Sequence, residues 1–378
     1  MTCVPSRRAS PTARGVRGAP RALAVVRLRE RRAARGTTLI ELMVGMAVGL
    51  FVVLVAVAIF ISTRTLHSVG SATTRMSENA RLAMDVLQSD IRNASFVGCR
   101  PLLNDAPIIV LLAGDGGFLS SAAGLKGYRG TGSDFAPALT GALAALTAAS
   151  APLPTSDVIS VRVPADMPGL GVVAAMPSTV AAPRVAASSP ANTLAMGDIV
   201  LVASCKASTM FQVTEANPAA TGVLTHGLGG SFVPGNATDD LQQRFRTDAT
   251  VYKMETRHYY VAPSALRPGT NSLYRLVVPG GAPAEEVASG VDRLLVTYGI
   301  DGGTAAGQQN VDHYAAADAV TSWDQVVSVR VQMLIGTAKD GVSRSTQYVD
   351  FGGSAVTFGD HRLRTVLTEV VTVRNGAP

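Results

Sequence analysis

The chain has 378 residues, 47% of them hydrophobic and 16% charged, which is enough to bury a sizeable core in one or two domains. Its formal net charge is +6, and a basic balance invites a nucleic-acid-binding interpretation. The charge is unevenly placed, however, because residues 1–36 hold ten arginines and one glutamate, a net +9. That leaves −3 for residues 37–378, so we expect no nucleic-acid partner.

Residues 1–36 have the character of a basic leader that precedes the folded protein. The segment ends at Gly36, immediately before an apolar stretch, and we predict that it is cleaved off there. Two translation starts stay open: Met1, and Val26, which would leave a short basic leader from Val26 to Gly36.

A predicted membrane segment follows, because Glu41 is the only charged residue among the 23 from Leu39 to Ile61. A helix of that length crosses the hydrocarbon core of a bilayer. The arginines before it place the leader in the cytoplasm and the residues after Ile61 on the outer side. A cleavable secretory signal is cut after its apolar run. Here the cut comes before the run, so we expect the apolar helix to stay in the mature protein.

Apolar and small residues continue past this segment at steps of three and four, the spacing of one face of an amphipathic helix. They are Leu66, Val69, Thr73, Met76, Ala80, Ala83, Leu87, Ile91 and Ala94. No proline occurs from Thr37 to Arg100, so we predict one helix over 37–94, roughly 87 Å long at 1.5 Å per residue. Two helices broken near Gly70 are the alternative.

After Cys99 the pattern changes to short β-type runs separated by glycine- and proline-rich turns. The runs cover 107–112, 157–163, 198–203, 211–214, 258–262, 273–278, 293–299, 326–336 and 366–374. They predict an antiparallel β-rich domain over 95–378. Two stretches rich in Ala, Pro and Ser, 136–155 and 172–192, are predicted to be weakly ordered inserted loops.

The chain has three cysteines, Cys3, Cys99 and Cys205. Cys3 lies in the leader, so the mature protein keeps an even pair on the outer side of the membrane. An even number of cysteines in an oxidising compartment indicates a disulfide, here between Cys99 and Cys205. Two unpaired buried thiols are the alternative.

The junction of leader and apolar helix, residues 35–41 (RGTTLIE), carries the strongest functional signal. A peptidase that cuts between Gly36 and Thr37 meets no side chain on the glycine side of the scissile bond. An acid at the bilayer centre costs about 2.5 to 3.5 kcal/mol on insertion scales, so Glu41 is a functional candidate by default. The alternative for Glu41 is a carboxylate that snorkels to the membrane interface.

With these residues in view, the stretch from Gly36 to Cys99 resembles minor pilins of the type IV pilus, and most closely those of the PilW family. The matching blocks are 36–44 (GTTLIELMV), 77–85 (SENARLAMD), 90–94 (DIRNA), 96–99 (FVGC), 197–205, 211–214, 290–292, 298–301, 323–330 and 374–375. Their order and spacing cover most of the chain from residue 36 onward, apart from the two inserted stretches.

The resemblance implies an α+β fold in which a long N-terminal helix, transmembrane in its first half, packs on an antiparallel β-rich pilin-like domain. It implies cleavage by a prepilin peptidase, N-methylation of Thr37, and pairing of the Glu41 carboxylate with the new amino terminus of a neighbouring subunit to set register. A buried charge is tolerated when it is paired. The chain departs from the family at one of these positions, since the family usually has phenylalanine where this chain has Thr37.

The implied function is to prime assembly of the pilus with other minor pilins and the major pilin, with a place at the pilus tip and a part in twitching motility or adhesion. The expected location is the inner membrane, with residues after the single span in the periplasm, and then the pilus (fimbrium) on the cell surface. A minor pseudopilin of a type II secretion system would share Gly36, Glu41 and the long helix, and stays the alternative.

No enzyme signature emerges from the sequence, so we expect neither catalysis nor a cofactor. The five histidines show no paired metal spacing, and we predict no metal site. Asp301-Gly302-Gly303 near Asp312 fits a turn better than a calcium loop. Trp323 and Tyr298 are predicted to be core residues. A membrane-anchored enzyme or a DNA-uptake receptor is disfavoured by the absence of a catalytic cluster and by the mature charge.

Overall fold

The computed structural model describes residues 38–98, 108–113, 118, 123–147, 150–228, 233–280, 282–302 and 310–373. The chain divides into two compact units, Met1–Ser62 and Thr63–Pro378, which are treated separately below. The predictions made for the leader, for Gly36 and Thr37, and for Cys99 lie outside the described residues.

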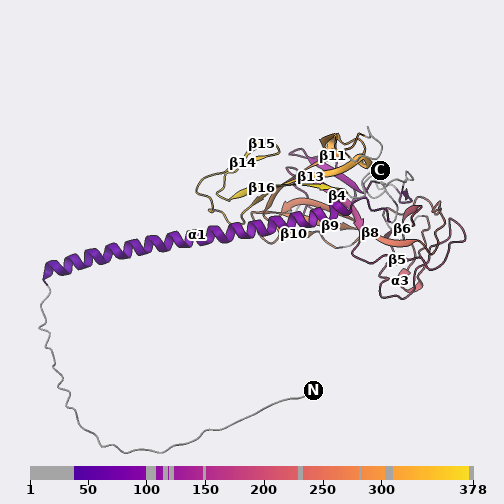
Figure 1. Ribbon diagram of the computed structural model, residues 1–378, viewed down its shortest axis with the longest axis horizontal. Coiled ribbons are helices and arrows are strands. Elements are labelled where there is room, and N and C mark those ends of the chain that lie inside the picture. The colour runs from indigo at the N-terminus through magenta and orange to yellow at the C-terminus, as the bar shows by residue number, and fades with distance from the viewer. Residues whose placement is uncertain are drawn as a thin grey trace, which may run out of the picture. The chain divides into compact units, whose positions relative to one another are not determined.

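The long helix α1 spans Leu39–Asn93 without a break (Figure 1). Gly45, Gly49 and Gly70 all lie inside it, because a helical glycine costs only about 1 kcal/mol relative to alanine and no proline is present to interrupt the hydrogen bonds. The structure therefore has one helix, and the predicted alternative of a break near Gly70 does not occur.

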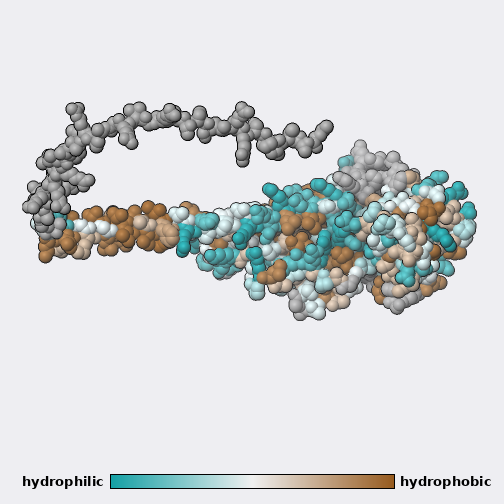
Figure 2. Space-filling model, turned by 90° about the horizontal axis from the view of Figure 1, so that it is seen from below, coloured by the Kyte–Doolittle hydropathy of each residue, from teal (hydrophilic) through white to brown (hydrophobic). Residues whose placement is uncertain are grey.

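The part of α1 in the first unit is apolar on all sides. Its large hydrophobic side chains from Leu39 to Ile61 are exposed, and they form a continuous apolar surface (Figure 2). Among the described helices, α1 is the one that is long and apolar enough to cross a membrane. A helix that is hydrophobic all round needs an apolar surrounding, and the described residues of this unit supply none, since no residue of the apolar window is buried.

The second unit is β-rich, so the predicted combination of a long helix and a β-rich region is confirmed. Its strands are β1 (Ile109–Val110), β2 (Leu125–Gly130), β3 (Phe135–Ala136), β4 (Val158–Pro164), β5 (Leu170–Gly171), β6 (Ile199–Ala203), β7 (Ser208–Gln212), β8 (Thr250–Pro263), β9 (Asn271–Val278), β10 (Glu285–Ser289), β11 (Val291–Ile300), β12 (His313–Ala316), β13 (Val326–Gly336), β14 (Tyr348–Phe351), β15 (Ser354–Thr357) and β16 (Arg364–Thr372). Short helices are α2 (Gly141–Ala144) and α3 (Pro218–Thr221), with the 3-10 turns η1 (Ala317–Ala319) and η2 (Trp323–Gln325).

The larger sheet has the order β1-β7-β6-β8-β4-β2-β3, with β5, β9 and β10 attached through β8 and β9. Strand β8 joins two regions, because its first half pairs with β5 and β6 while its second half pairs with β4 and β9. We call the region of β5, β6, β7 and the first half of β8, residues 165–254, the far lobe.

A second sheet has the order β12-β11-β13-β16, and all its pairings are antiparallel. Strands β14 and β15 form a separate hairpin whose two turn residues, Gly352 and Gly353, have φ values of +65° and +76°. Two successive residues with positive φ suit the tight hairpin turns that match the twist of β-strands.

The main core lies where α1 meets both sheets. Met76, Ala80, Ala83, Leu87 and Ile91 of the helix are buried there, against residues of β4, β8, β11 and β13. The predicted helical stripe is thus correct from Met76 onward, whereas Leu66, at 70% exposure, lies before the helix reaches the sheets.

Two predictions about the second unit need correction, one on the pairing of its larger sheet and one on the core of the far lobe. Strand β1 pairs with β7 in parallel, so the larger sheet is mixed and not wholly antiparallel; the long chain segment between these strands permits the parallel pairing. The stretch 172–192 was predicted to be weakly ordered, yet Val172, Met176 and Val185 are buried in the lobe's core. Isolated bridges from Val172 to Val185 and from Arg184 to Val223 hold it in place.

Candidate functional site

The start of α1 is shaped by Thr38, which caps the helix. The Thr38 side-chain oxygen accepts a hydrogen bond from the Glu41 amide at 3.3 Å, and its carbonyl accepts one from the Leu42 amide at 3.2 Å. Threonine followed three residues later by glutamate is the sequence of a capping box. Glu41 therefore favours the helix start as well as carrying the charge that the sequence singled out.

The Glu41 side chain is exposed at this position. A negative charge in the first turn interacts favourably with the positive end of the helix dipole. Within the described residues the carboxylate has no ion-pair partner.

The other half of α1 is fastened to the larger sheet by a buried carboxylate, Asp90, which is 5% exposed. One of its oxygens lies 2.8 Å from an Arg257 guanidinium nitrogen, and the other accepts a short hydrogen bond from the Tyr259 hydroxyl. Both partners project from β8. The same guanidinium also pairs with Glu255 at 3.1 Å, so each charge in the cluster has a partner.

Electrostatics reinforce this attachment. Burial acts to lower the pKa of Arg257, but the Asp90 and Glu255 carboxylates outweigh it and raise that pKa. Burial and the Asp90 charge together raise the pKa of Tyr259 well above its usual range, so the phenol stays protonated and donates to the carboxylate. Because breaking a buried pair leaves an uncompensated charge, the cluster fixes the position of α1 along β8.

A second attachment lies about three turns earlier in the helix. The Asn79 side-chain amide donates to the Ser289 carbonyl at 3.0 Å and to the Ser289 hydroxyl at 3.1 Å. Ser289 ends β10, next to the start of β11. Asn79 lies in the block 77–85 on which the sequence resemblance was based, and this contact gives a physical reason for an amide at that position.

The chain after α1 folds back over β6 and β8. Phe96 meets Tyr252 edge to face, with ring centroids 4.8 Å apart. Gly98 has φ of +84°, and a Cβ added to it would lie 2.4 Å from the Ala203 Cβ, so the position accepts glycine alone. Cys205 is exposed between β6 and β7, two residues beyond Ala203. Its predicted partner, Cys99, is outside the described residues, and their disulfide stays a prediction.

The two sheets are joined at Ser156 and Asp157, just before β4. The Asp157 carboxylate accepts hydrogen bonds from the Gly130 amide of β2 at 2.9 Å and from the Val296 amide of β11 at 2.8 Å. The Ser156 hydroxyl accepts a hydrogen bond from the Leu294 amide at 2.8 Å. Burial raises the pKa of Asp157 to about 6, although both amides act in the opposite direction.

Two further predictions fall within the described residues. Tyr298 is buried in the main core, as predicted, whereas Trp323 is partly buried and packs against it edge to face, with ring centroids 4.8 Å apart. The Asp312 carboxylate accepts a hydrogen bond from the Gly302 amide at 2.7 Å, which ties the connection from β11 to β12 as a turn would.

Of the predicted site residues, the described part of the chain includes Glu41 and Cys205, which belong to different units. Sequence reasoning missed the ion pair between Asp90 and Arg257. Asp90 lies at helical spacing between Leu87 and Ala94, on the buried face of α1. An acid on an apolar stripe was the available signal.

Comparison with known proteins gives one family. Residues 258–375 match the model of PilW, the Type IV Pilus-assembly protein W. The match starts in the second half of β8 and covers β9 to β16, slightly less than a third of the chain. No curated protein and no solved structure matches. The chain is therefore similar to PilW-like proteins, and the similarity indicates involvement in type IV pilus assembly.

Proposed function

We propose that the protein is a minor pilin that helps to prime assembly of the type IV pilus. A prepilin peptidase cleaves it between Gly36 and Thr37, and the apolar half of α1 holds the subunit in the inner membrane with the β-rich unit in the periplasm. The protein then enters the filament with other minor pilins and the major pilin, at or near the tip. It acts by association and not by catalysis.

The observation that carries this proposal is the helix α1. Its first half exposes an apolar surface from Leu39 to Ile61 that is interrupted by a single acid, and its second half is tied to the sheets by buried contacts. A plain membrane anchor requires the apolar length but not the acid or the rigid extension. A filament subunit uses all three, since the same helix must leave the membrane and pack against neighbours.

The exposed carboxylate of Glu41 is proposed to meet the amino terminus of a neighbouring subunit after cleavage. That terminus is the Thr37 nitrogen, with or without its methyl group, and it keeps a positive charge in either state. In a water-poor filament interior the pair is stabilising when both charges are present and costly when one is missing, so it favours a single axial register.

A disulfide between Cys99 and Cys205 is proposed to hold the segment after α1 against β6. The support is the position of Gly98, which packs on Ala203 and so brings the residue before Cys99 close to the residues before Cys205. The periplasm is an oxidising compartment in which such a bond persists.

The alternative of a type II secretion pseudopilin shares the features of α1. The match of residues 258–375 to a type IV pilus assembly family favours the pilus. Loss of twitching motility on deletion of the gene, with secretion intact, is the expected phenotype; the reverse pattern would support the pseudopilin.

The deciding experiment is mass spectrometry of the N-terminal peptide from membranes and from sheared surface filaments. We expect a peptide that begins at Thr37, with or without the mass of one methyl group, in both fractions. Gly36→Val should block cleavage. Gly45→Val is the matched control, because nothing lies within 4 Å of a Cβ added at Gly45. A chain that keeps residues before Gly36 in cells with active prepilin peptidase would contradict the proposal.

A further inference from the structure

Strand β16 lies at the edge of the second sheet, and it is the longest edge strand in the part of the chain that the structure describes. It pairs with β13 alone over nine residues, Arg364–Thr372, without a bulge. The other edge strands are short, since β1 and β3 have two residues each and β12 has four. Strand β10 has five, with two glutamates and a shift of register after Glu286. Short, charged and bulged edges resist pairing with another chain, and β16 is neither short nor bulged.

The unpaired backbone groups of this edge can be assigned residue by residue. At the two ends of the ladder, the Thr337 amide donates to the Leu363 carbonyl at 2.8 Å and the Val373 amide donates to the Val327 carbonyl at 2.9 Å. Antiparallel pairing alternates hydrogen-bonded and non-hydrogen-bonded pairs, so the odd-numbered residues of β16 bond to β13. These outward groups have no hydrogen-bond partner among the described residues. From position 366 onward they belong to Val366, Thr368, Val370 and Thr372.

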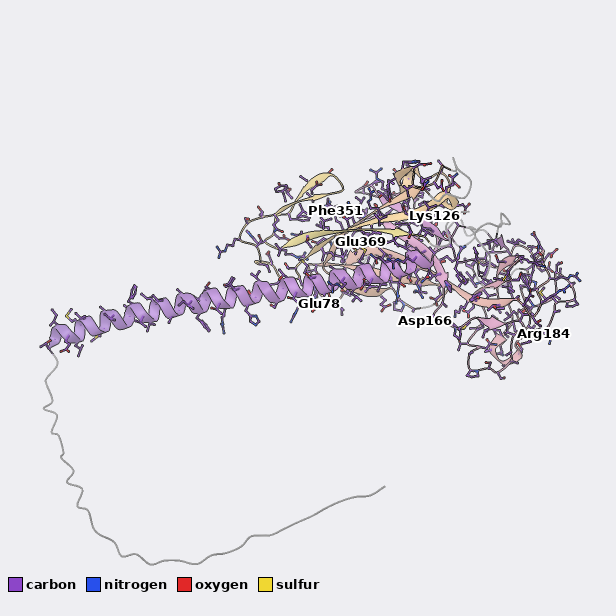
Figure 3. All side chains as sticks on the ribbon, viewed as in Figure 1. Glu78, Lys126, Asp166, Arg184, Phe351 and Glu369 are labelled. Carbon is purple, nitrogen blue, oxygen red and sulfur yellow. The ribbon has the colours of Figure 1, made fainter. Side chains whose placement is uncertain are left out.

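The side chains of these four residues suit an added strand. Successive side chains of a strand alternate between its two faces. Val371 and Val373 are buried in the main core, so the four side chains lie on the opposite face of the sheet. All four are β-branched and uncharged, a type that packs well between paired strands, and three of them are exposed, including Val370 at 51%. The one charge from Thr365 to Thr372 is Glu369, on the face toward α1 (Figure 3), so no charge on the outer face repels an incoming strand.

The side of this edge toward the helix is open as well. A groove of about 580 Å³ lies between β16 and the second half of α1, inside the second unit (Figure 1). Its charged lining residues are Arg81, Asp85 and Arg92 of α1 and Glu369 of β16. The two arginines balance the two acids, so the groove does not select a strongly acidic or strongly basic segment. Recognition at this edge therefore depends on the backbone of β16 and not on charge.

We propose that the free edge of β16 pairs with an extended segment of a different pilin subunit, so that the second sheet continues across the boundary between subunits. This inference deepens the minor-pilin function proposed above and rests on it. A row of unpaired amides and carbonyls binds an extended backbone, and the bound segment has no proline in its paired part because each amide is needed.

The partner strand is not β16 of a second copy. Pairing of β16 with itself is isologous and would close a twofold dimer. Subunits that follow one another along a filament meet through two different surfaces, so the free edge of one subunit meets another part of its neighbour. The shared sheet adds main-chain hydrogen bonds to the packing of the α1 helices.

The first test places the photocrosslinker p-benzoylphenylalanine at position 366, 368 or 370 of the full chain in piliated cells. We expect crosslinks to another pilin, identified by mass spectrometry of the joined peptides. The attachment point should move along the partner by about two residues for each step of the probe, because paired strands keep their register. A probe at Arg184, exposed in the far lobe (Figure 3), is the control and should give no such series.

The second test removes one backbone donor and leaves the ladder with β13 intact. Thr368→Pro deletes an amide that β13 does not use, and the proline ring obstructs an incoming strand. The amount of this variant in sheared filaments, relative to membranes, should fall about tenfold, because the lost hydrogen bond and the steric obstruction act together. Thr368→Val keeps the amide and the branched shape, so this matched control should enter filaments like the unmodified chain. Denaturant unfolding of both variants checks that the fold is retained.

Crosslinks in register to one segment of another pilin, with loss of incorporation in Thr368→Pro alone, would support the strand pairing. Crosslinks scattered over several surfaces, or equal incorporation of the two variants, would overturn it. Crosslinks from β16 to β16 of a second copy would overturn it in favour of a twofold dimer. A chain that is absent from filaments even without substitution would contradict the minor-pilin function itself, whereas filaments that accept Thr368→Pro normally contradict the strand pairing alone.

Hydrogen exchange of the unmodified chain decides the matter if Thr368→Pro proves to be unfolded. In the isolated chain, the outward amides of β16 should exchange fast and the amides bonded to β13 slowly. In filaments both sets should exchange slowly, so that protection is gained at every second residue. Outward amides that still exchange fast in filaments would overturn the proposal.

Discussion

Helix α1 carries one carboxylate near each end, and the two lie in opposite environments. Asp90 is buried and has two partners from β8 within the same subunit, whereas Glu41 is exposed on an apolar surface and has no ion-pair partner among the described residues. A charge that is satisfied inside the subunit stabilises the fold. In the assembly proposed above the partner of Glu41 belongs to a neighbouring subunit, and under that proposal the two acids separate folding from assembly.

The largest expected effect on stability comes from removing the buried carboxylate of Asp90. Asp90→Ala should lower the free energy of unfolding by about 3 to 4 kcal/mol, because it leaves Arg257 and Tyr259 buried without their acceptor; Arg257 keeps Glu255, which limits the loss. Denaturant unfolding of the detergent-solubilised chain measures it. Glu78→Ala, on the exposed face of the same helix (Figure 3), is the control and should change stability by less than about 0.5 kcal/mol. Equal effects of the two variants would contradict the role given to Asp90.

A second prediction concerns Asp157, a buried carboxylate that accepts hydrogen bonds from two backbone amides and forms no ion pair with the residues that the structure describes. Its folded pKa of about 6 is above the unfolded value of 3.8, so the folded state binds more protons between these values. Stability should therefore fall as pH rises from about 4 to about 6, by at most about 3 kcal/mol, and stay level above that range. Denaturant midpoints of unfolding, measured across pH 4 to 7, test whether stability falls as the pH rises.

The control for this pH dependence is Asp157→Asn, which removes the titrating group. It should flatten the pH profile while lowering stability overall, because an amide nitrogen cannot accept one of the two hydrogen bonds from Gly130 and Val296. A profile unchanged in this variant would assign the pH dependence to another group.

A smaller effect is expected at Asn79, whose interaction is neutral. Asn79→Ala removes two hydrogen bonds to Ser289 that share one half-buried amide group, so a loss of about 1 kcal/mol is expected. Ser77→Ala, exposed on the same helix, provides the comparison. A loss at Asn79 as large as that at Asp90 would show that the neutral attachment matters as much as the charged one.

Much of the fold could be predicted from the sequence because its strongest signals are local. The continuous apolar run and the absence of proline predicted α1, and each of the nine predicted β-type runs overlaps a strand. The missed strands have weaker local patterns. Strand β2 contains two glycines and two cations, and the first half of β8 is completed by pairing with β5 and β6, which lie elsewhere in the chain.

In the candidate site, too, residues with a local sequence signal could be predicted and residues brought together by the fold could not. Glu41 could be found from sequence because an acid is conspicuous in an apolar run. The attachment by Asp90 could not be derived, since its partner Arg257 is 167 residues away and only the pairing of β8 brings it to the helix.

The smallest effect on stability is expected at Glu41, and there it should coincide with a large effect on assembly. Glu41→Gln keeps a side chain suited to the capping box but removes the charge, so unfolding of the second unit should change by less than about 0.5 kcal/mol. The amount of the protein in sheared filaments, relative to membranes, should nevertheless drop. Thr38→Val is the complementary variant: it removes the cap observed at Glu41, costs about 1 kcal/mol of helix stability, and leaves the charge in place. If Thr38→Val reduced incorporation into filaments as strongly as Glu41→Gln, helix capping would be the reason for a glutamate at position 41. Glu41 would then have no role in pairing with a neighbouring subunit, and its contrast with Asp90 would no longer hold.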